Sequence, residues 1–260
     1  MTAAQDSPAA PRPSAPETPP LPIFYRRPVT LAPELHFGMA YRAPGNYAFA
    51  RDTNAIPLNV SEFSLAARHY PIVFAGTDPV MPVAVVGVAS RNRNLFVDDA
   101  GNWRPGVYIP AYVRRYPFIF LEDRKKKEFV LAIDEGAGLL AEREGPDDKL
   151  FWDGKPTPLV ERALAFCSEF QANLNFTRQF CKAVEEEKLL SEKEAGMSLV
   201  DGRYFRLTGF RLIEEPRFDK LPGKQLLKLR RRRFLHPIYL HLISTANWAT
   251  ILDLAAAQGV

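Results

Sequence analysis

The chain contains few of the residues that usually build catalytic metal or phosphate sites. Its 260 residues include two cysteines and four histidines, and they lack His-Glu-x-x-His and Cys-x-x-Cys motifs. His236 and His241 are five residues apart, about 140° around a helix, so they would not share a metal as an i, i+4 pair does. Glycine-rich phosphate loops, dinucleotide fingerprints and Gly-x-Ser-x-Gly elbows are also missing. We therefore expect no metal and no cofactor.

A large excess of one charge is missing too. The 34 basic and 30 acidic residues give a net charge of +4, which is too small to indicate nucleic-acid binding. One basic run occupies residues 228–233. Successive helical residues turn by about 100°, so these side chains would surround a helix and not form one stripe. We favour a solvated helix end over a nucleic-acid or lipid patch, and expect no nucleic-acid partner.

Long uninterrupted apolar runs are absent as well. Residues 234–257 are long enough to cross a bilayer, but polar residues within them make spanning costly. These are His236, His241, Ser244, Thr245, Asn247 and Asp253. We expect no membrane span and interpret the segment as a core helix, with Tyr239 and Trp248 anchored in the core.

The two cysteines, Cys167 and Cys181, fall in one stretch with helical apolar periodicity. Fourteen residues of helix separate them by about 21 Å, far beyond the ~7 Å Cα limit for a disulfide. They are expected to be buried thiols of a reducing compartment. No secretory signal is visible at the N-terminus, so the cytoplasm is the expected location.

Proline distribution divides the chain in two. Residues 1–22 are rich in Pro, Ala, Ser and Thr and cannot bury much apolar surface, which predicts a disordered tail. Residues 23–260 are expected to form one α+β domain. Its first part, residues 28–54, is aromatic but interrupted by Pro and Gly, and short strands or ordered loop are expected there.

A repeated pattern follows. A short helix is predicted over 60–68, ending at Tyr70-Pro71, with strands over 72–74, 82–88 and 94–97. A second helix over 109–115 ends at Tyr116-Pro117 and precedes strands over 118–120 and 128–134. The pattern Arg-x-Tyr-Pro-apolar-apolar-Phe thus occurs at 68–74 and again 46 residues later, counted from Tyr70 to Tyr116. Chance and true duplication both explain two copies.

The C-terminal half favours helices. A long amphipathic helix is predicted over 157–188, then a hairpin over 197–200 and 204–213 around Asp201-Gly202. A basic helix over 221–233 and a last helix over 236–256 complete the chain. The predicted fold is a mostly antiparallel sheet built on two helix-Tyr-Pro-strand units and covered by the long helix and a C-terminal helical pair.

The repeated units supply candidate ligand-binding residues. Arginine can bind a carboxylate or phosphate in two places, and tyrosine rings can stack on a planar or peptide ligand. The candidates are Arg114, Arg115, Tyr112, Tyr116, Arg68 and Tyr70. Alternatively, the rings belong to the core and the arginines stack on them. We favour that alternative for Arg68 and Tyr70 and leave both open for the second unit.

Two further candidates are Asp134 and Glu135, which end a predicted strand before Gly136 and Gly138. Acidic residues at a strand end can act as a general base in a cleft. More often they cap the following turn, which is the interpretation that we favour.

Several segments together resemble the SapC family of bacterial proteins. They are residues 60–76 ending Tyr-Pro-Ile-Val-Phe-Ala-Gly, Asn-Leu-Phe-Val-Asp at 94–98, Pro-Ala-Tyr-Val-Arg-Arg-Tyr-Pro-Phe at 110–118, Ile-Asp-Glu at 133–135, and Asp-Gly-Arg at 201–203. The resemblance covers about residues 24–256. The family label derives from a surface-layer gene cluster, which implies work on surface polypeptides, and it implies no catalytic residue set. The peptide-transporter permease of the same name is not similar to this chain.

These observations favour a non-catalytic accessory or peptide-binding protein of a bacterial surface-polypeptide or peptide-modification system, with a peptide or protein partner. The alternative is an enzyme acting on a peptide or carboxylate substrate, with Arg114 or Arg115 as anion clamp and Asp134 or Glu135 as base. A third hypothesis is a nucleic-acid or membrane-surface protein using residues 228–233. The oligomeric state is left open.

Overall fold

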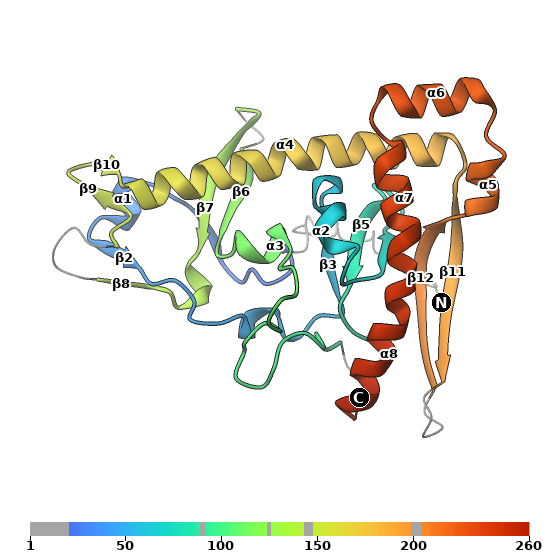
Figure 1. Cartoon of the computed structure of the whole chain (residues 1–260). Helices are drawn as coiled ribbons and strands as arrows, with labels where there is room; N and C mark the ends of the chain where they lie inside the picture. Colours follow the sequence, from blue (N-terminus) through green and yellow to red (C-terminus); the bar gives the residue numbers. More distant parts are fainter. Residues whose placement is uncertain (1–20, 89–91, 124–125, 143–147, 199–203, 260) are drawn as a thin grey trace, which may run out of the picture.

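The computed structural model describes residues 21–88, 92–123, 126–142, 148–198 and 204–259. Its longest element is helix α4, Pro158–Glu186, about 43 Å long at ~1.5 Å per residue. Thr157 in extended conformation and Pro158 begin the helix, and Lys188 at a φ of 53° follows its end. In Figure 1, α4 runs along one side of the molecule above two separate groups of strands. The predicted long helix is confirmed.

The first main sheet lies under the N-terminal half of α4. It has three antiparallel strands in the order β1-β7-β6. Their bounds are Pro28–Thr30 for β1, Phe118–Asp123 for β6 and Glu128–Asp134 for β7. Phe118 and Ile133, which face each other across β6 and β7, pack in one core cluster with Val160 and Cys167 of α4. Burial of these side chains holds the sheet against the helix.

The second main sheet has five antiparallel strands in the order β11-β12-β4-β5-β3. They are β3 (Ala55–Pro57), β4 (Ile72–Ala75), β5 (Met81–Val85), β11 (Leu190–Ser198) and β12 (Tyr204–Ile213). The predicted hairpin is present, but β11 begins at Leu190 and not at 197, because an edge strand tolerates the charged run that reads as loop in the sequence. The predicted turn at 201–202 lies outside the described residues.

The two repeated units occupy different sheets. The first has the 3-10 turn η2 (Val60–Glu62) and helix α2 (Phe63–Ala66) before β4 and β5; the second has helix α3 (Ala111–Arg114) before β6 and β7. Each hairpin receives a third antiparallel strand on its second member, giving the matching orders β3-β5-β4 and β1-β7-β6. The antiparallel α+β fold is thus as predicted, with each unit building its own sheet.

Smaller elements flank the first sheet. Strand β2 pairs with β8, and β9 pairs with β10, all antiparallel. Their bounds are α1 (Pro33–His36), β2 (Met39–Tyr41), η1 (Ala48–Ala50), η3 (Glu135–Ala137), β8 (Leu140–Glu142), β9 (Phe151–Trp152) and β10 (Lys155–Pro156). In Figure 1, α1, β2, β8, β9 and β10 lie around the start of α4.

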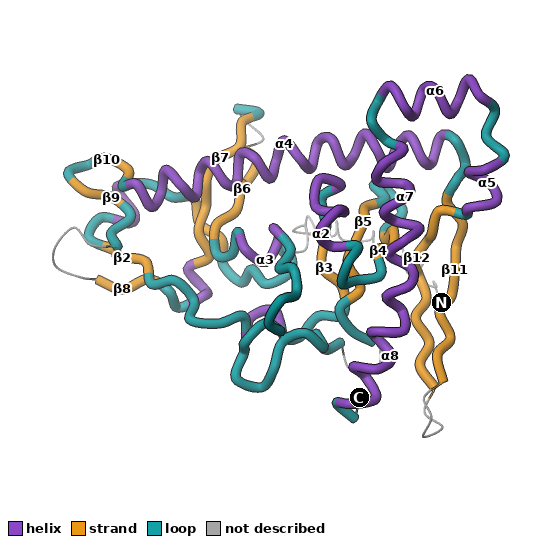
Figure 2. The backbone as a smooth tube through the Cα atoms, in the orientation of Figure 1, coloured by secondary structure: helices purple, strands orange, loops and turns teal. Residues whose placement is uncertain are grey.

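The C-terminal residues form helices beside the second sheet. They are α5 (Glu215–Asp219), α6 (Gly223–Arg231), α7 (Leu235–Ser244), the 3-10 turn η4 (Thr245–Asn247) and α8 (Trp248–Ala257). The predicted single helix over 236–256 is wrong, because η4 interrupts it. There the Asn247 side chain donates to the carbonyls of Ala67 and Tyr70, at 2.8 and 3.1 Å, which ties the interruption to the first repeated unit. Figure 2 shows α7 and α8 in succession beside the strands.

Two other expectations are corrected. The predicted strand at 94–97 is a turn with one bridge, Val97 to Trp103, because the Asn94 side chain accepts a hydrogen bond from the Phe96 amide and donates to Ala50. Tyr239 is 52% exposed and does not anchor the core. Trp248 does pack against the core.

Candidate functional site

Arg114 lies at the end of α3, a single helical turn that Pro110 precedes. Its Nε donates to the Ile109 carbonyl at 3.0 Å and its Nη2 to the Tyr108 hydroxyl at 3.3 Å. The guanidinium carbon lies 5.3 Å from the centre of the Phe166 ring on α4. The group is therefore oriented at the surface, and it forms no ion pair of 4 Å or less with a carboxylate of the described chain.

Glu62 lies below this arginine and is almost fully buried. Its Oε1 accepts from the Tyr108 hydroxyl at 2.9 Å and from the Ala111 amide at 2.7 Å, and its Oε2 accepts from the Asn59 amide at 2.9 Å. Burial raises the pKa of Glu62, and these donors and the charge of Arg114 oppose the rise. One carboxylate thus caps η2 and the start of α3, and so joins the two repeated units.

A pocket of about 270 Å³ opens beside these groups, between α2, α3 and α4. We call it the Arg114 pocket. Its lining includes Asn59, Glu62, Tyr108, Arg114, Phe166 and Asn173. Burial and the charge of Glu62 raise the pKa of Tyr108 to about 12, so its hydroxyl stays protonated near neutral pH. The pocket combines an oriented cation, amide groups and aromatic walls.

Arg115 has a different environment from its neighbour. Its guanidinium carbon lies 4.2 Å from the ring centre of Tyr112, 4.3 Å from that of Phe170 and 5.7 Å from that of Tyr25. Burial raises the pKa of Tyr25 and Tyr112, and the charge of Arg115 opposes both shifts. Arg115 and Tyr112 thus form an aromatic cluster that fastens the N-terminal segment to α4.

Tyr116 and Asp134 contact each other inside the first sheet. The Tyr116 hydroxyl donates to Asp134 Oδ2 at 3.2 Å, and the backbone amides of Arg26 and Arg27 donate to the same carboxylate at 3.1 and 2.6 Å. Burial first, and the charge of Asp134 second, raise the pKa of Tyr116 to about 12. Asp134 is 1% exposed, so these contacts hold the chain that enters β1.

Glu135 continues the same connection at the surface. It pairs with Arg27 at 2.7 Å and lies 3.4 Å from Nε2 of the buried His36. No hydrogen bond or ion pair between described residues joins Arg114 or Arg115 to Asp134 or Glu135. Neither Asp134 nor Glu135 lines the pocket that Arg114 borders.

The two candidate residues of the first repeated unit, Tyr70 and Arg68, lie outside the Arg114 pocket. Tyr70 is fully buried, its hydroxyl donates to the Tyr108 carbonyl, and its ring meets Phe96 edge to face at 4.9 Å. Arg68 is exposed on the turn that follows α2. Burial lowers the pKa of the neighbouring His69, and the charge of Arg68 lowers it further. Tyr70 positions the segment that carries Tyr108, and Arg68 contributes no described contact to the Arg114 pocket.

The amino-acid sequence matches the model of one protein family. The model of the SapC family matches residues 31–251. The chain belongs to the SapC family. No curated protein and no solved structure matches it. The SapC match contains the whole Arg114 pocket, whereas Tyr25 of the aromatic cluster lies outside the matched residues.

Three important residues of this SapC-family protein were not singled out in the sequence: Glu62, Phe166 and Asn173. The spacing Asn59-x-x-Glu62 is a capping box, which could have indicated that Glu62 is buried at a helix start. Phe166 and Asn173 lie seven residues apart and share one face of α4, but the sequence does not show that α3 lies opposite.

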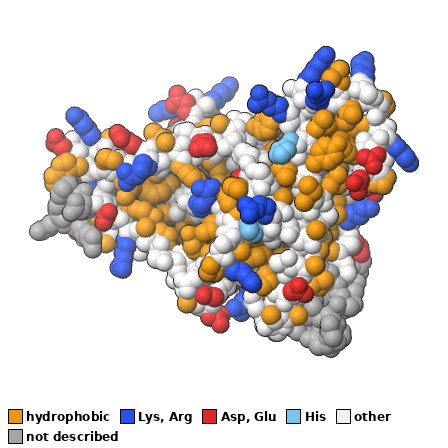
Figure 3. Space-filling model, in the orientation of Figure 1, with side chains coloured by type: hydrophobic (Ala, Val, Ile, Leu, Met, Phe, Trp, Pro, Cys, Tyr) orange, Lys and Arg blue, Asp and Glu red, His pale blue; other side chains and the backbone are white. Residues whose placement is uncertain are grey.

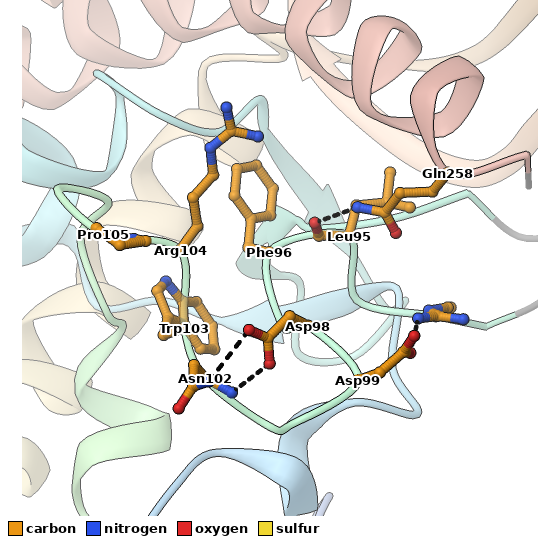
Figure 4. Close-up of a pocket in the computed structure, with 10 residues that line it drawn as sticks. Leu95, Phe96, Asp98, Asp99, Asn102, Trp103, Arg104, Pro105 and Gln258 are labelled. Carbon is orange, nitrogen blue, oxygen red and sulfur yellow. Dashed lines mark hydrogen bonds and ion pairs between the residues drawn. The ribbon is translucent and has the colours of Figure 1, made fainter.

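The largest of the described pockets lies elsewhere. It has a volume of about 700 Å³ and is formed by residues 93–105 with Gln258 (Figure 4). Its carboxylates maintain the loop: Asp98 accepts from Asn102 at 2.7 and 3.1 Å, and Asp99 pairs with Arg93 at 2.7 Å. In Figure 4, Arg104 points away from Asp98, past Phe96. None of the residues predicted as ligand-binding lines it.

Within the described residues, we looked for metal-binding groups and for membrane-spanning helices, and neither is found. No group of three His, Cys, Asp or Glu side chains there is arranged to hold a metal ion. No helix there has the length and apolar character needed to cross a membrane. Cys167 and Cys181 are free and buried, and burial raises the pKa of their thiols to about 11 and about 12.

Proposed function

We propose that this SapC-family protein is a non-catalytic peptide-binding protein that serves a bacterial surface-polypeptide or peptide-modification system. The observation that carries the proposal is the oriented guanidinium of Arg114, which has no ion-pair partner in the described chain and borders a pocket. An arginine fixed through Nε and Nη2 keeps its remaining N–H groups available for a carbonyl or carboxylate oxygen of a ligand.

The rest of the Arg114 pocket suits a peptide. The half-buried side-chain amide of Asn173 forms no described hydrogen bond, and an amide can both donate to and accept from a peptide backbone. Phe166 and Phe170 offer apolar surface for a ligand side chain. Seven of the eleven lining residues carry polar or charged side chains, so the pocket offers hydrogen-bonding groups for a peptide main chain beside this apolar surface.

The enzyme alternative has one supporting observation, which is the raised pKa of Glu62 at the base of the pocket. Both oxygens of Glu62 already accept hydrogen bonds from protein donors, and three donors converge on the carboxylate. This arrangement favours a structural cap over a proton-accepting base.

The proposal is tested by selecting peptides from a random display library on the full-length protein and measuring their affinity by calorimetry. Arg114→Gln is expected to weaken binding about tenfold, the effect of losing one charge-assisted contact. Arg178→Gln, at an exposed position of α4 outside the described pockets, is the matched control and should bind like the wild type. Equal affinities of all three proteins would refute the proposal.

Mass spectrometry of the selected peptides after incubation separates binding from catalysis. The proposal expects unchanged peptide masses. A mass change that the wild type produces and a folded Glu62→Gln variant does not would favour the enzyme alternative.

A further inference from the structure

A second pocket, of about 590 Å³, lies beside the Arg114 pocket. We call it the Arg230 pocket. Its polar lining includes Arg230 at the end of α6, Arg233 in the connection to α7 and His236 at the start of α7, and its apolar walls include Phe176 and Leu240. In the part of the chain that is described, neither arginine forms an ion pair, whereas Lys228 of the same helix pairs with Glu186 and Glu187.

The two pockets adjoin. Ser61 lines both of them, and α4 forms a wall of both, through Phe166, Phe170 and Asn173 in one and Phe176 in the other. These α4 positions are separated by four, three and three residues, so they share one helix face. In Figure 1, α3, α2 and α7 follow one another beneath α4. Residues of α2, α3 and α4 line the Arg114 pocket, and residues of α2, α4 and α7 line the Arg230 pocket.

The charges along this path are unequal. Glu62 and Glu169 line the Arg114 pocket together with its arginine, whereas no carboxylate lines the Arg230 pocket. Figure 3 shows this face, where Lys and Arg side chains are interspersed with hydrophobic ones. A uniformly anionic strand or membrane would meet repulsion from Glu169 at one end. A ligand with anionic groups at one end only matches both pockets.

We propose that the two pockets form one groove for an extended peptide that places an acidic side chain between Arg230 and Arg233. The inference rests on the proposed function and adds the class of ligand. Phe166 and Phe176 are about 15 Å apart along α4, the length of about five extended residues. Between them η2 is hydrogen-bonded to α4, from Asn59 to Phe170 and from Val60 to Thr177, so the peptide passes over the exposed Ser61. Arg114 and Asn173 contact the main chain of the peptide, and the acidic side chain lies about five positions away.

Two pools of fluorescent decapeptides test the inference. One carries an Asp-Glu pair near one end and varied residues elsewhere, and the other carries Asn-Gln at the same positions. We expect the acidic pool to bind about tenfold more tightly, measured by anisotropy at low salt. Arg230→Gln should remove most of this difference. Arg231→Gln, at the adjacent exposed position that lines a different pocket, should preserve it.

Other results of these measurements would overturn either the acidic specificity or the proposed function. If both pools bind equally and Arg114→Gln weakens both, the proposed function stands and the acidic specificity is wrong. If neither pool binds, or if binding is independent of Arg114, the proposed function fails, and the inference fails with it. Tighter, Arg230-dependent binding of short single-stranded DNA or of phosphatidylglycerol vesicles would replace the peptide with a polyanion.

Discussion

Arg114 and Arg115 are adjacent in the chain but have unlike environments. The Arg115 guanidinium carbon lies 4.2 Å from the ring centre of Tyr112 and 4.3 Å from that of Phe170. The Arg114 guanidinium is oriented by Ile109 and Tyr108 at the rim of a pocket. Neighbouring helical residues diverge by about 100°, which is why one arginine stabilises the fold and the other is available to a ligand.

Arg115→Ala is therefore expected to lower the free energy of unfolding by about 2 kcal/mol, through lost packing and cation–π contacts. Arg114→Ala should lower it by less than about 1 kcal/mol, because its side chain is exposed. Urea denaturation followed by circular dichroism measures both. Equal effects of the two substitutions would contradict the separation of their roles.

Asp134→Asn is expected to destabilise the protein by about 2–3 kcal/mol, because an amide group would face donors that now bind a carboxylate. Glu135→Gln is the control, and it should cost less than about 1 kcal/mol, since it weakens a partly exposed ion pair. Peptide affinity at the Arg114 pocket should be unchanged in both variants. Loss of peptide affinity in a folded Asp134→Asn protein would show that this carboxylate takes part in binding.

Glu62→Gln is expected to cost about 1–2 kcal/mol of stability, because one of the helix caps loses its acceptor. Hydrogen exchange followed by mass spectrometry should show faster exchange at the Asn59 or Ala111 amides. Tyr108→Phe, which keeps both capped amides, should leave that exchange slow. Unchanged exchange at both amides in Glu62→Gln would refute the double cap.

The sequence predicts much of this fold, for identifiable reasons. Helix α4 and the two Tyr-Pro steps were correct because amphipathic periodicity and proline act locally. The break at Asn247 depends on the carbonyls of Ala67 and Tyr70, which are 180 and 177 residues earlier in the chain. No local sequence pattern shows such a contact. For the same reason the sequence indicated Arg114 and Arg115 but could not distinguish their environments.

Stability should also depend on pH through His241. Its Nε2 accepts from the Ile213 amide at 3.0 Å, and burial lowers its pKa to about 4. The folded state therefore keeps this imidazole neutral, while the unfolded state takes up a proton as the pH falls below about 6.5. Stability is thus lost on acidification, by about 2 kcal/mol between pH 7 and pH 5.

His241→Gln, which keeps an acceptor for the Ile213 amide, removes this dependence. Denaturation of both proteins at the two pH values measures the difference. Glu62 contributes with the opposite sign, because its raised pKa favours the folded state as the pH falls, but it is present in both proteins and cancels. Equal pH dependence of wild type and variant would contradict the role of His241.

The groove itself is tested most directly by blocking it at Ser61, the residue common to its two pockets. Because Cys167 and Cys181 are buried, the thiol introduced by Ser61→Cys can be modified selectively with a bulky maleimide. Ser168→Cys, at an exposed α4 position that lines no described pocket, receives the same reagent as the control. We predict that modification of Ser61→Cys weakens binding of a selected peptide at least about tenfold relative to the same variant before modification, while Ser168→Cys binds equally well before and after modification. Unchanged affinity after complete modification of Ser61→Cys would contradict the account.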